Sequence, residues 1–182
     1  MLINVSQLLK EPIGSTRTYQ VSETVDITED GTGSQVEGDV KLTRTGRSIL
    51  VQGRLNTAVK IACSRCLCLF DCPLTFDIEE EFFPVIDVFS GMPVAMPEEP
   101  GYLTIDEHHI LDLTDAIRQS AIVVIPMKPL CREECAGLCP QCGQDLNRGT
   151  CDCSQPSVDN RWAKLASLKT KKSLSKRRKG TE

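Results

Sequence analysis

Eight of the ten cysteines in this 182-residue chain stand in four close pairs, and this spacing constrains the fold more than any other feature. Two thiolates a few residues apart on one turn can bind the same ion, and two such pairs complete the tetrahedral coordination that zinc prefers. The pairs are Cys63 with Cys66, Cys131 with Cys135, Cys139 with Cys142, and Cys151 with Cys153. The sequence therefore predicts structural zinc, in as many as two sites.

The last two pairs are close enough in sequence to form one site. Gly143 directly follows the CxxC of Cys139 and Cys142, and a glycine there permits the turn that points backbone amides at the sulfurs. We therefore expect a zinc-ribbon-like site made of Cys139, Cys142, Cys151 and Cys153. The other two pairs, Cys63, Cys66, Cys131 and Cys135, are then left for a long-range site. In an alternative pairing, Cys131 or Cys135 replaces one member of the zinc-ribbon-like site.

Two further cysteines have a different pattern. Cys68 and Cys72 share one parity with Phe70, Leu74 and Phe76, so they fall on the same face of a strand. Free cysteine commonly behaves as a small buried hydrophobe. We expect both residues to belong to the core rather than to a metal site.

Hydrophobic periodicity predicts strands in the first half of the chain and one helix in the second. Apolar residues alternate with polar ones over 19–27, 36–42, 49–61 and 68–78, with a turn-forming Asp-Gly-Thr-Gly run between the first two. From 113 to 124 they recur at helical spacing. Asp112 is a plausible N-cap for that helix, and Pro126 stops it.

These segments predict an α+β fold with four parts. The first is an antiparallel β domain over 1–83, with a sheet of about four to six strands in the whole protein. An acidic, proline-containing connection over 84–110 follows, then a helix plus cysteine-rich zinc module over 111–156. A C-terminal helix and basic tail occupy 157–182.

Charge is distributed very unevenly along the chain. Residues 161–182 contain nine Lys or Arg and one acid, whereas residues 77–115 contain eleven acids and no Lys or Arg. A basic segment of this kind suits contacts with RNA phosphates, and an acidic surface repels them. The candidate RNA-binding residues are Lys169, Lys171, Lys172, Lys176, Arg177, Arg178 and Lys179. The alternative is a solubilising tail that binds nothing specific.

The sequence lacks the signatures of common catalytic sites. It contains no GxxxxGK[ST] phosphate loop, no GxSxG elbow and no HExxH pair, and its two histidines, His108 and His109, lie in an acidic loop. We expect neither an enzyme nor a small-molecule substrate. No stretch reaches the roughly 18 apolar residues of a membrane span, and we expect a cytoplasmic protein in which cysteines bind metal rather than form disulfides. A thiol redox protein that uses a CxxC pair is a less favoured alternative.

Three motifs together resemble a known family. They are Cys63-Ser64-Arg65-Cys66, the run from Gly137 to Gly143 (GLCPQCG), and the segment from Asp159 to Leu168 (DNRWAKLASL). In this combination the chain resembles the YceD family of bacteria and plastids, which is named for accumulation of large-subunit ribosomal RNA. The resemblance implies a non-enzymatic ribosome biogenesis factor for 23S rRNA that binds rRNA, a large-subunit ribosomal protein, or both. An adaptor that binds protein without contacting RNA is the alternative.

Overall fold

The structure is a computed structural model that describes residues 1–28, 31–95 and 101–153. The chain divides into two compact units, one from Met1 to Gly137 and one that begins at Leu138. The helix and basic tail expected over 157–182 lie outside the described residues. No helix in the described ranges is long and apolar enough to cross a membrane.

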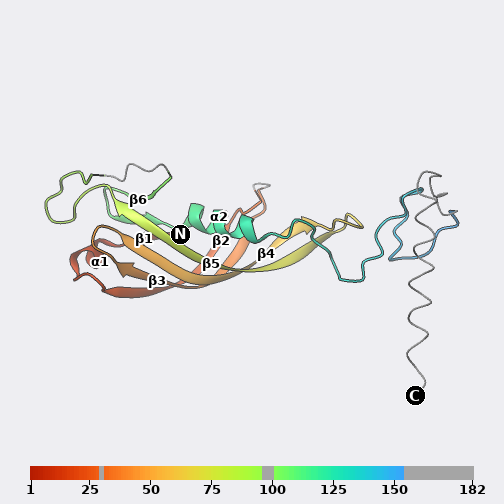
Figure 1. Ribbon diagram of the computed structural model, residues 1–182, viewed down its shortest axis with the longest axis horizontal. Helices are drawn as coiled ribbons and strands as arrows, with labels where there is room; N and C mark the ends of the chain where they lie inside the picture. The colour runs from red at the N-terminus through yellow and green to blue at the C-terminus, as the bar shows by residue number, and fades with distance from the viewer. Residues whose placement is uncertain (29–30, 96–100, 154–182) are drawn as a thin grey trace, which may run out of the picture. The chain divides into compact units, whose positions relative to one another are not determined.

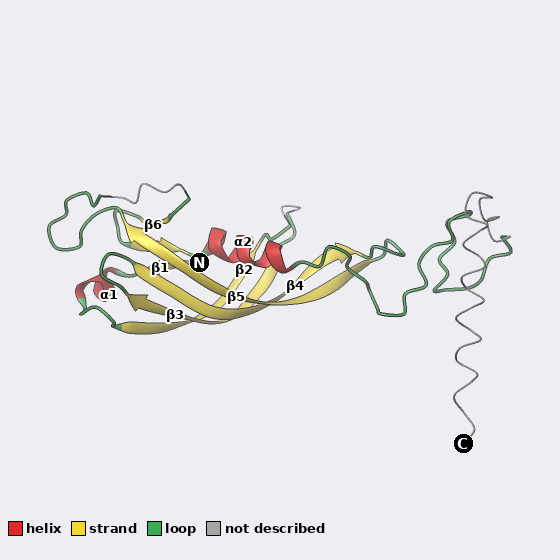
Figure 2. Ribbon diagram, viewed as in Figure 1, coloured by secondary structure: helices red, strands yellow, loops and turns green. Residues whose placement is uncertain are grey.

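The first unit is built on one seven-stranded sheet (Figures 1 and 2). Its strands lie in the order β1-β7-β6-β5-β4-β3-β2, and all neighbours are antiparallel except β5 and β6, which are parallel. The strands are β1 (Leu2–Asn4), β2 (Thr16–Val25), β3 (Ser34–Arg44), β4 (Ile49–Ala62), β5 (Leu69–Pro84), β6 (Leu103–Ile105) and β7 (Ile110–Asp112).

The predicted α+β class is wrong, because the described fold is mostly β. Its helices are only α1 (Ser6–Lys10) and α2 (Thr114–Val124), against seven strands of which four have ten or more residues. The sheet is also mixed rather than antiparallel. The unpredicted strand β6 lies inside the segment 84–110 that was expected to be a connection, and the unpredicted strand β7 begins at its last residue.

Alternation of apolar and polar residues explains the long strands. On one face of β4, Ile49, Val51 and Leu55 are fully buried. On the opposite face, Gln52 and Arg54 are exposed. A strand with one apolar face must cover that face, and a neighbouring strand in matching register places its own apolar residues beside it. In β3, Leu42 pairs with Val51 in this way.

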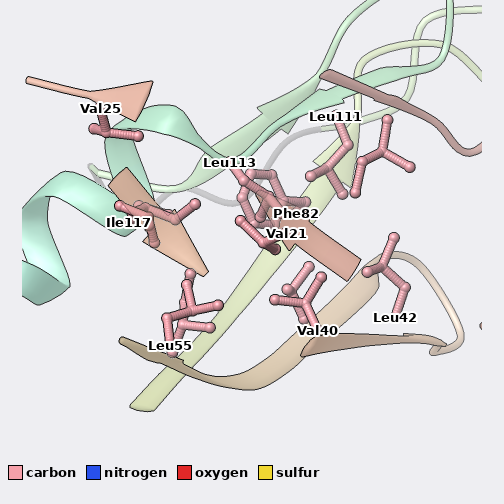
Figure 3. Close-up of a cluster of buried hydrophobic side chains, with 14 of the residues drawn as sticks. Val21, Val25, Val40, Leu42, Leu55, Phe82, Leu111, Leu113 and Ile117 are labelled. Atoms are coloured by element: carbon pink, nitrogen blue, oxygen red, sulfur yellow. The ribbon is translucent and has the colours of Figure 1, made fainter. Parts of the chain in front are cut away.

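The buried faces of the strands meet α2 in one core, shown in Figure 3. Val21 and Leu55 come from the sheet, Phe82 from the end of β5, and Leu113 and Ile117 from the start of α2. Each of these side chains is at most 1% exposed. Full burial of such a side chain contributes about 1.5–3 kcal/mol, so this cluster stabilises the packing of α2 on the sheet.

Two glycines allow β3 and β4 to approach each other closely within the curled sheet of Figure 1. A Cβ added to Gly53 would lie 2.4 Å from the carbonyl oxygen of Asp39, and one added to Gly38 would lie 2.3 Å from that of Arg54. Backbone atoms cannot yield as a flexible side chain can. Glycine is therefore needed at both positions.

Candidate metal centres

The first cysteine cluster begins at the turn that joins β4 to β5. Cys63 follows β4 directly, its N–H donates to the carbonyl oxygen of Cys68 over 2.9 Å, and its carbonyl oxygen accepts the N–H of Leu67 over 3.0 Å. Leu67 has a positive φ of 59°, which closes the turn tightly. The turn brings Cys63 and Cys66 to the same side of the hairpin tip.

A segment more than sixty residues later in the chain is attached to this turn. Ser64 N–H donates to the carbonyl oxygen of Pro129 over 2.8 Å, and Arg65 Nη1 donates to that of Cys135 over 2.9 Å. Gly137 packs so closely that an added Cβ would lie 3.0 Å from the Arg65 carbonyl oxygen. These contacts bring Cys131 and Cys135 to the tip of the hairpin.

The four sulfur atoms at this tip are arranged as a tetrahedral metal site requires. All lie within 4.8 Å of one another, with Cys63 Sγ 3.8 Å from Cys135 Sγ and Cys66 Sγ 3.7 Å from Cys131 Sγ. A Zn–S bond of about 2.3 Å in a regular tetrahedron separates two sulfurs by about 3.8 Å. We call Cys63, Cys66, Cys131 and Cys135 the clamp cluster, and its geometry fits zinc.

The electrostatics of the clamp cluster favour a cation. The backbone N–H of Cys131, followed by that of Cys66, lowers the pKa of Cys63 to about 6, whereas burial, followed by contact with Cys66, raises the pKa of Cys131 well above its ordinary value. Cys63 is 0% exposed and Cys135 is 2% exposed. Four crowded thiols cannot all ionise alone, but a divalent cation compensates their charge.

The second cluster belongs to the second unit and forms within a short stretch of chain. Cys139 N–H donates to the carbonyl oxygen of Gln144 over 2.8 Å, and Gly143 N–H donates to that of Cys139 over 2.9 Å. Gly143 has a φ of +73°, the conformation expected of a glycine at this position. The four sulfurs, which lie within 4.8 Å of one another, are those of Cys139, Cys142, Cys151 and Cys153, and we call them the local cluster.

The local cluster also has unequal thiols. The backbone N–H groups of Cys142 and Gln141 lower the pKa of Cys139 to about 6. Hydrogen bonding with Cys142, followed by burial, raises the pKa of Cys153 to about 12. Cys139 is 7% exposed and Cys142 is exposed, so this cluster is more open to solvent than the clamp cluster.

The structure thus brings together the same two sets of four cysteines that the sequence analysis paired, and all ten cysteines have free thiols. Four thiolates complete the tetrahedral coordination of zinc, so neither cluster leaves an open position on the ion where a water could bind and be activated. Such an arrangement serves to hold chain segments together. The candidate RNA-binding residues of the tail lie outside the described residues.

Cys68 is the cysteine that the sequence analysis misplaced. It is exposed rather than part of the core, and its Sγ lies 3.1 Å from that of Cys66. The backbone N–H of Cys68 also lowers the pKa of Cys66. Its CxC spacing from Cys66, the same as that between Cys151 and Cys153, was the available signal. Cys72 is 8% exposed and belongs to the core, as predicted.

The sequence of the chain matches the model of a known protein family. The family model of the large ribosomal RNA subunit accumulation protein YceD matches residues 51–169, which include every cysteine of both clusters. No solved structure shows significant similarity to the chain.

Curated relatives come from mycobacteria and a plant. An uncharacterized protein of Mycobacterium tuberculosis (strain ATCC 25618 / H37Rv) is 28% identical over 144 residues, which cover 75% of this chain and 63% of the relative. The large ribosomal RNA subunit accumulation protein YCED homolog 1, chloroplastic, of Arabidopsis thaliana is 25% identical over 170 residues, which cover 80% of this chain and 52% of the relative. The chain therefore spans less than two thirds of the length of either relative. With the family model matching well over half of its residues, the chain belongs to the YceD family of large ribosomal RNA subunit accumulation proteins.

Proposed function

We propose that the protein is a non-enzymatic factor that supports the synthesis, processing or stability of 23S ribosomal RNA in the cytoplasm, by binding rRNA, a large-subunit ribosomal protein, or both. The observation that carries this proposal is the match of residues 51–169 to the YceD family, and that family is named for accumulation of large-subunit rRNA. The four-cysteine clusters support a binding role, because full thiolate coordination stabilises structure rather than activating water.

We further propose that each cluster holds one zinc ion. In the clamp cluster, zinc would join the β4–β5 turn to the segment that contains Cys131 and Cys135, and the amide of Arg65, 3.5 Å from Cys63 Sγ, would donate to a bound thiolate. In the local cluster, zinc would close the loop between Cys142 and Cys151. Metal binding would then contribute directly to folding.

For rRNA itself, the proposed contacts are the seven Lys and Arg residues of the tail between Lys169 and Lys179. Their density of positive charge supports phosphate contacts, and the eleven acids between 77 and 115 would keep the phosphate backbone away from that part of the body.

An adaptor that binds only protein is the second candidate. It is supported by acidic residues on the exposed face of β5, among them Asp77, Glu79 and Glu81, which suit a basic ribosomal protein. A CxxC redox protein is a third candidate, and zinc that stays bound under mild oxidation would exclude it.

Crosslinking in cells, followed by identification of the attached RNA and protein, tests the proposal. We expect 23S rRNA fragments to be recovered with the protein. A pull-down repeated with ribonuclease separates the two candidates, because an RNA binder loses its ribosomal partners after digestion and an adaptor keeps them. Recovery of neither large-subunit rRNA nor a large-subunit protein would contradict both.

A further inference from the structure

A cavity of about 170 Å³ lies beside the turn that joins β3 to β4. Its apolar lining residues are Leu9 of α1, Pro84 at the end of β5, and two valines of the following loop. Its polar lining residues come mainly from the turn itself. The complete lining is Leu9, Arg44, Thr45, Gly46, Arg47, Ser48, Pro84, Asp87, Val88 and Val94, and we call this cavity the turn pocket.

The turn presents unused hydrogen-bond donors. Thr45 N–H donates to the Ser48 carbonyl oxygen over 3.0 Å, and Ser48 N–H donates to Thr45 Oγ1 over 3.1 Å, so these two residues close the turn. Among the residues that the structure describes, the intervening N–H groups of Gly46 and Arg47 have no acceptor, and the Arg47 guanidinium has no ion-pair partner. Successive free N–H groups beside a guanidinium are a typical anion-binding arrangement.

The other charged groups at the turn pocket are Arg44, Asp87 and Glu81. Arg44 donates through Nη1 to the backbone carbonyl oxygen of Glu11 and forms no ion pair within the described ranges. Asp87 is the only carboxylate in the lining, and its Oδ1 already accepts the N–H groups of Phe89 and Ser90 over 3.1 and 2.7 Å.

Just outside the lining, Glu81 Oε1 accepts the hydroxyl of Ser48 and lies 3.5 Å from that of Thr45. Asp87 and Glu81 therefore balance the two guanidinium groups of the lining, and both belong to the acidic stretch over 77–115. Because both carboxylates already accept hydrogen bonds from the protein, the place for a phosphate is at the N–H groups of Gly46 and Arg47, away from them.

The apolar lining residues and the volume of the turn pocket indicate which kind of ligand would fit. An apolar cavity of about 150 Å³ accommodates one benzene ring, so about 170 Å³ offers room for one planar base but not for a helical duplex. RNA-binding proteins that read sequence commonly recognise unpaired bases that have left the stack.

We propose that the turn pocket binds one unpaired nucleotide of an RNA strand, with the base against Leu9, Val88 and Val94 and the phosphate at the N–H groups of Gly46 and Arg47. This inference rests on the proposed rRNA-binding function and adds a contact in the body of the protein, separate from the basic tail. It also predicts a preference for single-stranded over duplex RNA, which a basic tail alone does not provide.

The test compares two arginine variants of the full, zinc-loaded chain. Arg47→Gln removes the free guanidinium, and Arg54→Gln is the matched control, because Arg54 is exposed on the same sheet and pairs with Asp77 over 2.7 Å. The affinity for a single-stranded 12-nucleotide RNA and for a duplex of the same length is measured by fluorescence anisotropy at several salt concentrations. Thermal unfolding checks that both variants fold.

We expect Arg47→Gln to weaken single-strand binding about tenfold at low salt and to reduce its salt slope by about 0.7. Arg54→Gln should leave both values unchanged. Filling the cavity with Val94→Phe should weaken single-strand binding without changing the salt slope. Equal behaviour of Arg47→Gln and Arg54→Gln would overturn the inference while leaving RNA binding by the tail intact.

A titration with uridine monophosphate separates failure of the inference from failure of the proposed function. If the wild-type protein binds no RNA, the rRNA-binding part of the proposed function is contradicted. Uridine monophosphate binding that Arg47→Gln abolishes would then identify a free-nucleotide pocket and overturn the assignment to RNA. Binding of neither probe would overturn the turn pocket as a nucleotide site altogether.

Discussion

At the scale of single residues, the close approach of β3 and β4 depends on two glycines that no residue with a side chain can replace. Gly53→Ala places a Cβ 2.4 Å from the Asp39 carbonyl oxygen, so the strands must separate, and we expect a loss of about 1–3 kcal/mol in the free energy of unfolding. Gly46→Ala is the control, since nothing lies within 4 Å of its added Cβ. It should leave stability unchanged or raise it by up to about 1 kcal/mol. Urea unfolding measures both, and equal losses would contradict the close approach of β3 and β4.

Zinc binding by the clamp cluster should depend on each of its four cysteines. Cys135→Ser removes a buried ligand and should reduce bound zinc from about two ions to about one per chain, because three thiolates hold the ion far less firmly. Cys68→Ser is the control, because Cys68 is exposed and lies outside both sets of four. Native mass spectrometry should find the full complement of zinc in this variant. Loss of zinc from Cys68→Ser but not from Cys135→Ser would assign the fourth ligand to Cys68.

Spacing in the sequence was enough to predict the grouping of cysteines but not the position of Cys68. Pairs such as Cys63 and Cys66 are recognisable because both residues lie on one turn and their spacing is local. The alternation of β5 itself is as predicted, since Cys72, Leu74 and Phe76 are buried on one face, but alternation places a side chain only inside a strand. The structure starts β5 at Leu69, one residue after the predicted start, and Cys68 lies in the turn.

At the scale of elements, α2 stabilises the first unit through one face only. Ile117 is 0% exposed in the core, whereas Val123 near the end of the helix is 84% exposed. We expect Ile117→Ala to lower the free energy of unfolding by about 2–5 kcal/mol. Val123→Ala should change it by less than about 0.5 kcal/mol, because it removes no buried surface. Similar effects of the two substitutions in chemical denaturation would contradict the packing of α2 on the sheet.

The long elements were predictable from the sequence, and the short ones were not. Strands β2 to β5 have ten to sixteen residues, enough for alternation to be recognised, and α2 ends at Val124, two residues before Pro126. Strands β1, β6 and β7 have three residues each, too few for any period. They form through pairing with residues far away in the sequence: β6 pairs in parallel with the end of β5 on the edge opposite β4, and β7 and β1 continue the sheet from there. The fold class was wrong for this reason.

At the scale of the whole molecule, metal removal should release one segment and spare the sheet. The clamp cluster connects Cys66 to Cys131 across 65 residues of sequence, whereas the sheet has its own core. We expect a chelator to accelerate amide hydrogen exchange at 129–137 while the amides of β4 keep their protection. Loss of protection throughout β4 would instead make zinc a condition for folding the sheet, and no change at 129–137 would contradict the clamp.

RNA binding by the whole protein should depend on the positive charges of the basic tail. Deletion of 169–179 removes seven positive charges and should weaken RNA binding to the same extent for all sequences, with a flatter dependence on salt. Filter binding over a salt series measures both quantities. Unchanged affinity and slope after the deletion would exclude the tail from RNA binding.

Two four-thiolate zinc sites built from eight cysteines fix the metal content of the chain. Native mass spectrometry of the reduced, freshly purified full chain should show about two zinc ions per molecule. One ion per molecule would leave only one of the two clusters as a zinc site. A chain that binds no metal while its fold is intact would contradict both zinc sites.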